Sequence, residues 1–443
     1  MGLPLFAAQE SSAPSLAASS GARRRICIQT FGCSHNASDG EYLAGQLVAA
    51  GYAVAGDATD ADLLLINSCT VKGPSQDSFL SAVRAAKAKG VPLVVAGCVP
   101  QADPHNKTLA GLSVIGVQQL ESVVDIVERT LVGQSVRATD KSHVPSLALP
   151  KLRKNRLIEI IPISLGCLNA CAYCKTKHAR GHLRSYPLDE ILARLRTAVA
   201  EGVAQVWLTS EDSGAYGRDI GASLPQLLDA ILAELSPGVM LRVGMANPPY
   251  ILEHLDAIAC ILNHRQVFSF VHLPAQSGSD SVLGAMKREY SVADFQLVVD
   301  DLRARVPGLT VATDIICGFP TETQDDFAMT LELVERNRFP ILNISQFYPR
   351  PGTPAARMRL LPTQEVKRRS TELTRLFKSQ RPYDALVGTE QEVWISTVED
   401  GQLVGHTKSY VLAFLPLDHA LLGKKVRARI THAGKHFVRG EVV

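Results

Sequence analysis

Residues 164–178 read Ser-Leu-Gly-Cys-Leu-Asn-Ala-Cys-Ala-Tyr-Cys-Lys-Thr-Lys-His and carry thiols at Cys167, Cys171 and Cys174. Three thiolates at C-x3-C-x2-C spacing can hold three irons of a 4Fe-4S cube, whereas a fourth would close it. One iron is therefore left open to a further ligand. The alternatives are a zinc knuckle or three buried thiols. Zinc usually takes four ligands from paired C-x2-C units, which disfavours the knuckle.

Length and composition describe a globular chain of several domains. With 443 residues and about 150 residues per domain, about three domains are expected. No run of about 18 apolar residues appears, so we expect no membrane span. The net charge of +3 is small, and a nucleic-acid surface would have to come from local clustering. Nine cysteines with cluster-type spacing indicate a reducing compartment and metal thiolates instead of disulfides.

The first third of the chain predicts an α/β domain behind a tail. Residues 1–24 are rich in Ala and Ser and are expected to be a disordered tail, with an organellar transit peptide as the alternative. Residues 25–133 alternate apolar runs with helical patterns, which predicts a doubly wound parallel sheet. The expected strands are 26–31, 63–67 and 92–96, and the expected helices are 38–50, 74–89 and 119–131. Residues 134–155 lack periodicity and are expected to be a linker.

A cysteine follows each of these three strands, at Cys33, Cys69 and Cys98. Such sheets bind ligands outside the carboxyl ends of their strands, so the three thiols should converge on one rim. A lone cysteine there would be interpreted as a small buried hydrophobe. Three equivalent positions, each beside Gly, Ser or a Pro-flanked turn, favour a second metal-binding triad. The remaining thiols lie in apolar runs and are assigned to the core: Cys27, Cys260 and Cys317.

Residues 156–378 predict an open, partial (β/α)6 barrel. Six strand-like runs, separated by helical patterns, cover 157–163, 205–209, 239–244, 268–272, 310–315 and 342–347. The chemistry of such a barrel lies at the carboxyl ends of its strands. The C-x3-C-x2-C loop follows the first strand, which is where this rule places a site.

Polar residues after other strands are candidates for the same pocket. They are Ser210, Glu211 and Asp212 after the second strand, Gln276 after the fourth, and Asp314 in the fifth. The alternative for each is helix capping, because Ser, Asp and Thr cap helices irrespective of function. Arg288 and Arg350 are weaker candidates, since a solvated charge explains either equally well.

The last segment, residues 379–443, predicts a small closed β-barrel that binds RNA. Five short strands are expected at 392–398, 403–407, 410–415, 425–430 and 436–438, as in oligonucleotide-binding barrels. Between residues 401 and 443, seven Lys and Arg face two Asp and Glu, a net charge of +5. Cations beside exposed aromatic rings fit RNA backbone contact with base stacking. The candidates are Lys424, Lys425, Arg427 and Arg429, with Tyr410, Phe414 and Phe437.

These motifs resemble a known enzyme family. The cysteine loop of residues 167–174 resembles that of the radical S-adenosylmethionine (SAM) superfamily, whose open iron chelates SAM. The patterns T-F-G-C-S-x-N-x-S-D, N-S-C-T-V and A-G-C-V-P-Q are similar to those of its methylthiotransferase branch. Residues 176–181, 210–219 and 247–250 resemble the eukaryotic and archaeal threonylcarbamoyladenosine tRNA methylthiotransferases. The resemblance runs from about residue 25 to the end, where this family has a TRAM domain.

The resemblance implies two 4Fe-4S clusters, with SAM as both radical source and methyl donor. The cluster on Cys167, Cys171 and Cys174 would cleave SAM, and the radical would take hydrogen from C2 of the modified adenine. The second cluster would carry the sulfur. Tyr173 occupies the position of an aromatic residue that this family places against the adenine of SAM, and Ser210, Glu211 and Asp212 resemble the turn that holds its amino group and ribose.

The resemblance also implies partners and a location. It implies a tRNA substrate, a flavoprotein or ferredoxin-type electron donor, and a sulfur source whose identity stays open. We expect a monomer. Animal members of the branch end in a hydrophobic tail, and none is seen up to Val443. A cytoplasmic location is therefore expected, with a peripheral endoplasmic reticulum or organellar location as alternatives.

Three alternatives to this function remain. They are a methylthiotransferase for isopentenyladenosine in tRNA, one for a ribosomal-protein side chain, and a non-catalytic iron–sulfur RNA-binding module. A threonylcarbamoyl group carries a carboxylate that needs a cation in a pocket, whereas an isopentenyl group needs only apolar walls. We expect the cation to come from the residues directly after the cysteine loop, with a solvated loop as the alternative: Lys175, Lys177, His178 and Arg180.

Overall fold

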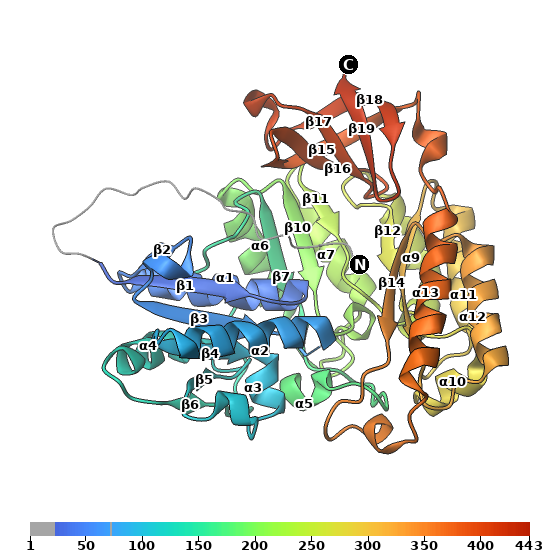
Figure 1. The fold of residues 1–443 in the computed structure, drawn as a ribbon. Coiled ribbons are helices and arrows are strands. Elements are labelled where there is room, and N and C mark those ends of the chain that lie inside the picture. Colours follow the sequence, from blue (N-terminus) through green and yellow to red (C-terminus); the bar gives the residue numbers. More distant parts are fainter. Residues whose placement is uncertain (1–22, 71–72) are drawn as a thin grey trace.

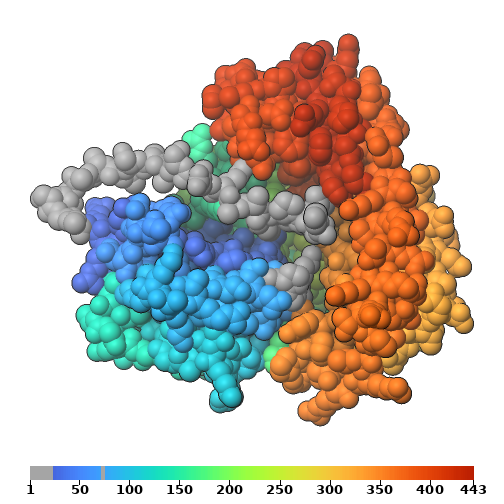
Figure 2. All heavy atoms as spheres, in the orientation of Figure 1, coloured from blue at the N-terminus to red at the C-terminus, as the bar shows by residue number. Residues whose placement is uncertain are grey.

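The computed structural model describes residues 23–70 and 73–443 and has three parts. An N-terminal α/β domain packs beside a central half-barrel of strands and helices, and a C-terminal β-barrel sits at one end of both (Figure 1). Figure 2 shows the N-terminal and C-terminal parts as separate lobes. The predicted fold class is confirmed. The tail predicted for residues 1–24 falls, except for its last two residues, outside the described residues.

The N-terminal domain is built on a six-stranded parallel sheet of order β2-β1-β3-β4-β5-β6. The all-apolar run in β3 is buried throughout, as expected for a parallel strand covered on both faces. The strands are β1 Arg25–Thr30, β2 Ala53–Ala55, β3 Leu63–Ser68, β4 Leu93–Gly97, β5 Ser113–Ile115 and β6 Arg137–Ala138. The helices are α1 Ser34–Ala49, α2 Gly73–Ala88, α3 Cys98–Ala102 and α4 Val123–Leu131, with single turns η1 Ala58–Asp60, η2 Lys107–Leu109 and η3 Leu120–Ser122.

The predicted linker, residues 134–155, is part of the fold. Its strand β6 pairs with β5 and completes the sheet, and Leu147 is fully buried. Lys151 is buried too, because its ammonium pairs with Glu41 of α1 and Glu159 of the next strand. Two-residue strands and single buried contacts carry no periodic signal, so the sequence pattern indicated only a connection.

The central part contains two three-stranded parallel sheets, β11-β10-β7 and β12-β13-β14, joined by a bridge between Leu241 and Val267. Its strands are β7 Ile158–Pro162, β10 Gln205–Thr209, β11 Met240–Arg242, β12 Phe270–His272, β13 Thr310–Cys317 and β14 Ile341–Gln346, with a small pair β8 Ser164–Leu165 and β9 Arg184–Ser185. Its helices are α5 Thr176–Arg180, α6 Leu188–Ala200, α7 Leu224–Glu234, α8 Pro248–Leu252, α9 Leu255–Asn263, α10 Asp280–Ala285, α11 Val292–Arg305, α12 Gln324–Asn337 and α13 Thr363–Ser379, with turns η4 Ser213–Ala215 and η5 Pro354–Arg357.

Neighbouring helices cover the two edges of this open barrel. Helix α1 of the N-terminal domain packs on β7, where the Ser38 hydroxyl donates to the Ile160 carbonyl at 3.0 Å. Helix α13 packs on β14. Because the edges are covered from different parts of the chain, the N-terminal domain is held in a defined position against the barrel.

The C-terminal part is a closed barrel of order β15-β16-β17-β19-β18, as predicted. It contains β15 Glu390–Glu399, β16 Gln402–Thr407, β17 Leu412–Pro416, β18 Lys425–Ala433 and β19 Phe437–Val442, with turns η6 Asp384–Leu386 and η7 His419–Leu421. It caps the amino ends of the central strands: the Asn155 amide, just before β7, donates to Ser396, and the Ser269 amide, just before β12, donates to Lys408. None of the helices in the described ranges is long and apolar enough to cross a bilayer.

The prediction that Tyr410 is an exposed stacking residue is wrong. Its ring is 7% exposed and lies between the C-terminal barrel and the central strands, with ring centroids 5.0 Å from Phe268 and 4.2 Å from His406. Lys408 is also used internally, because its ammonium donates to backbone carbonyls at the end of α9. Aromatic and cationic residues in this stretch therefore dock the barrel to the core.

Candidate active site

The C-x3-C-x2-C loop is fixed by backbone contacts. Gly166 has φ +74°, and a Cβ there would lie 2.0 Å from the His182 carbonyl oxygen, so the turn into the loop requires glycine. The Cys167 amide donates to the Gly181 carbonyl at 3.2 Å. Ala172, inside the loop, donates its amide to Met286 and accepts from the Ala355 amide, each at 2.9 Å. Segments far apart in sequence thus hold the three thiols at the carboxyl end of β7.

The thiols of this loop, the first triad, lie close enough to interact electrostatically. Burial, with smaller effects of Asp212, Cys174 and Cys171, raises the pKa of Cys167 to about 12. Burial also raises the pKa of Cys171, while Arg288 opposes this by donating from Nη1 to its sulfur at 3.1 Å. The Thr176 amide points at the Cys174 sulfur at 3.4 Å. Neighbouring thiols with such donors fit a site that gains its thiolates when metal displaces the protons.

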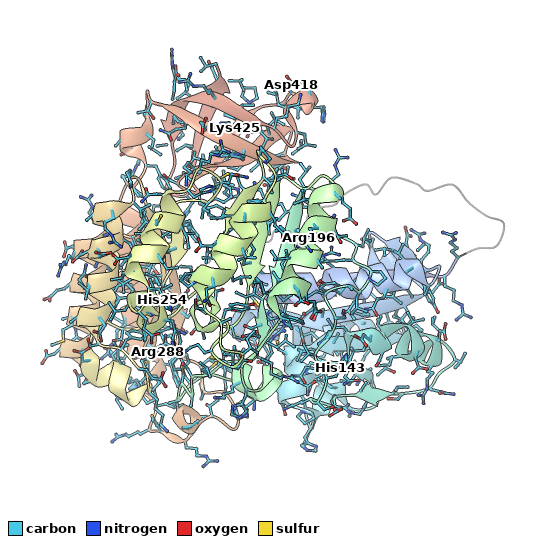
Figure 3. The ribbon with its side chains drawn as sticks, turned by 180° about the vertical axis from the view of Figure 1, so that it is seen from behind. His143, Arg196, His254, Arg288, Asp418 and Lys425 are labelled. Atoms are coloured by element: carbon cyan, nitrogen blue, oxygen red, sulfur yellow. The ribbon has the colours of Figure 1, made fainter. Side chains whose placement is uncertain are left out.

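Arg288, a weak candidate from sequence, belongs to this site. Its guanidinium reaches the Cys171 sulfur on one side and the Asn247 side-chain oxygen on the other. Asn247 in turn donates to Asp212 from its backbone at 3.0 Å and from its side chain at 2.5 Å. A chain of hydrogen bonds through Asn247 and Arg288 therefore connects the turn after β10 to a thiol of the first triad. Figure 3 places Arg288 toward the end of the molecule opposite Lys425 of the C-terminal barrel.

The second triad assembles as predicted, at the rim of the N-terminal sheet. Cys33 follows β1, Cys69 follows β3 and Cys98 opens α3 after β4. The order β2-β1-β3-β4-β5 reverses between β1 and β3, which is where doubly wound sheets bind ligands. A Cβ at Gly32 would lie 2.1 Å from the Cys69 Cβ, so glycine permits this approach.

Asn36 of α1 links the thiols of the second triad. Its side-chain oxygen accepts from the Cys33 sulfur at 3.5 Å and from the Cys98 sulfur at 3.6 Å. A hydrogen bond with Cys69, together with Arg180 and His35, lowers the pKa of Cys33 to about 6 against the effect of burial. Burial raises the pKa of Cys98 to about 12. Cys33 is therefore the more acidic of the two thiols, and both lose their protons when a metal binds.

Neither triad is arranged around a single metal ion. Among the described residues, no three His, Cys, Asp or Glu side chains converge as they would around one metal ion. Thiolates around one zinc ion lie about 2.3 Å from a common point. A cube of four irons is larger and accepts thiolates that stand further apart, with one iron left open when only three are present.

Buried charged groups fill the boundary between the triads. The Glu211 carboxylate lies 3.1 Å from His35 Nδ1 of the N-terminal domain and 3.0 Å from Arg180 Nε of α5. His35, Asn36 and Asp39 were not among the predicted site residues, although Asn36 and Asp39 stand as N and D in the pattern T-F-G-C-S-x-N-x-S-D. They lie at the start of a helix that the structure buries.

The predicted SAM contacts are placed as follows. Tyr173 is partly buried against Ala172 and Phe319 beside the first triad, and Ser210 accepts from the Asp212 amide at 3.0 Å. Asp212 acts as the capping alternative describes, because its carboxylate accepts from Gly214 and Asn247. Gln276, with φ +67°, pairs by backbone with β13, in which Asp314 contacts His272 Nε2 at 2.8 Å. SAM contacts stay predictions for all six residues: Tyr173, Ser210, Glu211, Asp212, Gln276 and Asp314.

The cations expected to meet a substrate carboxylate are mostly occupied. Lys175 Nζ donates to the Pro351 carbonyl at 2.6 Å, Lys177 Nζ donates to Leu168 and Asn169, and Arg180 is buried in ion pairs. The His178 pKa is lowered by burial and by Lys175 and Lys141, so its imidazole is neutral at physiological pH.

Arg350 is a better candidate than these residues for contact with a substrate carboxylate. Burial lowers its pKa, and the neighbouring Cys174, Cys69 and Tyr173 raise it. Its charge therefore acts on a thiol of each triad.

The predicted RNA-binding cations lie on the outer face of β18, opposite two carboxylates of β15. Lys425 pairs with Glu392 at 2.6 Å, and Arg427 and Arg429 pair with Glu390 at 3.1 and 3.0 Å. All of these pairs are solvent-exposed, as is Lys424. Phe414 and Phe437 are partly buried against each other, with centroids 5.3 Å apart.

The three other cysteines do not all follow the prediction. Cys27 and Cys317 are buried in the core as expected, whereas Cys260 is exposed. Cys260 lies on α9, whose apolar stripe is broad, and the thiol falls on the solvent side of that stripe.

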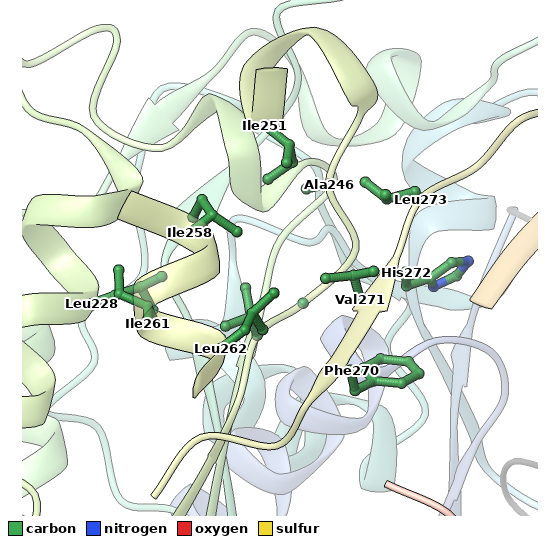
Figure 4. A pocket seen from close by; sticks show the side chains of 12 residues that line it. Leu228, Ala246, Ile251, Ile258, Ile261, Leu262, Phe270, Val271, His272 and Leu273 are labelled. Atoms are coloured by element: carbon green, nitrogen blue, oxygen red, sulfur yellow. The ribbon is translucent and has the colours of Figure 1, made fainter. Parts of the chain in front are cut away.

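An apolar cavity of about 20 Å³ lies between α7, α8, α9 and β12. Its lining is aliphatic apart from Phe270 and His272, and Figure 4 shows the His272 ring pointing away from the aliphatic side chains. A cavity of this size holds about one water molecule, so it is a packing defect and not a substrate site.

Three family profiles match the chain, one on each part. Residues 25–114 match the Uncharacterized protein family UPF0004, residues 161–334 the Radical SAM superfamily, and residues 384–443 the TRAM domain. The predicted division into an α/β domain, a radical SAM core and a TRAM-like barrel is thereby confirmed.

Three relatives are similar to this chain over 95% of its length. The chain is 53% identical over 429 residues to the threonylcarbamoyladenosine tRNA methylthiotransferase of Homo sapiens, covering 95% of this chain and 74% of that protein. It is 55% identical over 430 residues to the Drosophila melanogaster protein of the same name, covering 95% and 78%. It is 35% identical over 426 residues to the probable threonylcarbamoyladenosine tRNA methylthiotransferase of Pyrococcus abyssi (strain GE5 / Orsay), covering 95% and 99%.

A solved structure shares the fold at low sequence identity. The radical S-adenosylmethionine methyltransferase TsrM from Kitasatospora setae matches with a TM-score of 0.54 and 15% identity over 75% of each chain. This likeness concerns the arrangement of strands and helices.

Proposed function

The chain belongs to the threonylcarbamoyladenosine tRNA methylthiotransferase family, and from this premise we propose that it converts N6-threonylcarbamoyladenosine in tRNA into its 2-methylthio derivative. The single observation that carries the proposal is the juxtaposition of two cysteine triads across one domain boundary. Sulfur transfer from one site to a carbon activated at another requires that both reach one atom, and a shared boundary provides that proximity.

Each triad has a separate task in this proposal. Cys167, Cys171 and Cys174 hold a 4Fe-4S cluster with SAM on its open iron, and Cys33, Cys69 and Cys98 hold a second cluster at the rim of the N-terminal sheet. When bound, the first supplies the electron that cleaves SAM and the second supplies the sulfur. The chain's own residues hold these groups: Arg288 donates to Cys171, and Asn247 keeps Arg288 in place. The electron donor and the sulfur source come from outside the chain.

Arg350 is the best-placed cation for the threonylcarbamoyl carboxylate. It follows β14 in the segment that packs on the cysteine loop, since Ala355 bonds to Ala172. Its charge interacts with Cys174 and Cys69, one from each triad, so a base that both sites can reach is also within its reach. A guanidinium binds a carboxylate by two parallel hydrogen bonds, which an isopentenyl group cannot offer.

The C-terminal barrel supplies tRNA affinity in this proposal, through cations on the outer face of β18. We propose a monomer, because the two triads and the RNA-binding barrel are present in one chain, and a cytoplasmic location, because the substrate is tRNA.

Deleting the gene and measuring tRNA nucleosides by mass spectrometry tests the proposal. We expect threonylcarbamoyladenosine to accumulate without its methylthio form, while methylthio-isopentenyladenosine is unchanged. Loss of the isopentenyl species alone would show the other tRNA substrate. Purified enzyme that modified a ribosomal protein and not tRNA would overturn the substrate class.

A further inference from the structure

Helix α5 touches both triads. It begins two residues after Cys174, and the residue that follows it, Gly181, accepts the Cys167 amide. On its other side, Ala179 packs against Cys98 in a small buried cluster. The last residue of α5, Arg180, is 1% exposed and is the largest fully buried side chain among the described residues. The position of this helix therefore determines how the two sets of thiols face each other.

Arg180 makes three contacts with the N-terminal domain and one with Glu211 of the central part. Its Nη2 donates to Asp39 at 2.5 Å and to the side-chain oxygen of Asn36 at 3.3 Å. Its Nε lies 3.0 Å from Glu211, and its backbone carbonyl accepts from Gln118 at 3.1 Å. The remaining nitrogen, Nη1, is buried and has no hydrogen-bond partner among the described residues.

Binding of a cluster to the second triad changes which groups can donate hydrogen bonds to the Asn36 side-chain oxygen. In this structure the Cys33 and Cys98 thiols donate to the Asn36 oxygen. Each thiol gives up its proton when it binds iron, so both donors are lost in the loaded state. Arg180 Nη2 is then the donor that keeps this buried oxygen satisfied.

The charge of the loaded site also needs compensation. Three thiolates in a buried site bring negative charge into a medium of low polarity, which is costly unless a cation is near. Arg180 is that cation, and Asp39 and Glu211 hold it in one orientation. An unsatisfied N–H costs free energy when buried, so Nη1 marks a place where an acceptor is expected.

We propose that Arg180 is a positioning residue for sulfur transfer: it fixes the two triads relative to each other, and its Nη1 donates to sulfur held at the triad of Cys33, Cys69 and Cys98. The inference rests on the proposed function, because it requires a cluster at that triad. Hydrogen bonds to the sulfurs and nearby charge set the reduction potential of an iron–sulfur cluster. Arg180 therefore raises the potential of this cluster.

The experiment uses full-length protein in which Cys167, Cys171 and Cys174 are replaced by Ala, so that only the second cluster is present. Its midpoint potential is measured by redox titration followed by electron paramagnetic resonance. Arg180→Met should lower the potential, and Asp39→Asn, which removes a negative charge beside the guanidinium, should raise it. Arg194→Met is the matched control, because Arg194 is also a buried arginine paired with a carboxylate, Glu159, but contacts neither triad.

A second measurement uses the intact enzyme. Arg180→Met should lower the yield of methylthio product per 5′-deoxyadenosine about tenfold or more, since small misplacements of reacting groups cost that much. Arg180→Lys keeps the charge and should restore the potential but not the yield, because an ammonium cannot replace the fork of donors. If Arg180→Met does not fold, the potentials of Asp39→Asn and Arg180→Lys still test the proposed role of Arg180.

Normal iron content with wild-type potentials in both Arg180→Met and Asp39→Asn, or a wild-type potential in whichever of them folds, would overturn the inference. Absence of iron from the second triad of the parent protein would instead contradict the proposed function.

Discussion

Three arginines lie at the cysteine sites, and each interacts with more than one side chain. Arg288 reaches Cys171 and Asn247, Arg180 reaches Asp39 and Glu211, and the charge of Arg350 acts on Cys174 and Cys69. Arginine suits these positions because its planar group makes several directed hydrogen bonds and stays charged when buried. The three arginines therefore place positive charge beside thiols of both triads.

At the residue scale, Arg350→Gln tests substrate recognition. The variant should raise the KM for tRNA carrying threonylcarbamoyladenosine about 10-fold to 100-fold, since a charge-assisted hydrogen bond contributes about 1.5–3 kcal/mol. SAM cleavage without RNA should be unchanged, because the Arg350 backbone carbonyl still accepts from Thr353 and keeps the segment in place. Arg357→Gln, an exposed arginine in η5, is the control. An equal loss of SAM cleavage in the Arg350 variant would assign the residue to the cluster and not to the substrate.

At the element scale, strand pairing determines how basic the C-terminal barrel is. The net charge of +5 was counted over residues 401–443 and therefore leaves out Glu390 and Glu392, which precede this segment. The antiparallel register places Glu392 opposite Arg427 and Glu390 opposite Arg429. Exposed pairs of this kind are weak, about 0–1 kcal/mol, so phosphate can replace the carboxylates.

Replacing Lys424, Lys425, Arg427 and Arg429 with Gln should weaken tRNA binding and flatten its dependence on salt. Each lost phosphate contact reduces the steepness of the plot of log binding constant against log salt concentration by about 0.9 for a duplex. Glu390→Gln with Glu392→Gln is the matched control, and we expect it to strengthen binding because it frees the same cations. Binding isotherms between about 50 and 200 mM salt measure both effects. An unchanged slope in the cation variant would place the RNA surface on another element.

The joint between this barrel and the core should depend on pH through His406. Burial, with a smaller effect of Arg242, lowers its pKa to about 3, and the ring stacks on Tyr410 at an angle of 5°. An unfolded histidine has a pKa of about 6.5, so the folded state binds fewer protons below that pH. The contribution of His406 to the free energy of unfolding is therefore fully present above about pH 6.5 and falls as the pH drops toward 3. Urea unfolding should lose about 1.4 kcal/mol between pH 7.5 and 5.5 from this group. His406→Phe keeps an aromatic ring, and a pH dependence as steep as that of the wild type would exclude this cause.

At the scale of the whole molecule, the sequence predicted the three parts and both triads, because periodicity and strand-end position are local properties. It did not predict contacts between parts. The contacts of Glu211 with His35 and Arg180, which come from two other segments, were not predicted. Tyr410 was interpreted as exposed, yet the core buries it. Such contacts depend on how domains dock, which no local pattern records.

The docking of the C-terminal barrel also places it and the first triad at opposite ends of the central strands. The C-terminal barrel caps the amino ends of the central strands, whereas the first triad lies at their carboxyl ends. A tRNA held by the outer face of β18 must therefore extend along the molecule to place one base between the triads. Cluster chemistry and RNA affinity should consequently be separable by mutation.

The two triads should likewise be separable from each other. Replacing Cys33, Cys69 and Cys98 with Ala should halve the iron of anaerobically reconstituted protein from roughly eight atoms, given four irons per cluster. Production of 5′-deoxyadenosine should persist, because the loop of Cys167, Cys171 and Cys174 is held by Gly181, Met286 and Ala355 and not by the second triad. Methylthio product should disappear. Replacing Cys27 and Cys260, which belong to neither triad, with Ala is the control and should leave the iron content unchanged. Loss of SAM cleavage in the triple variant, with its circular dichroism spectrum intact, would show that the second site acts on the first through the Arg180 contacts and does not only supply sulfur.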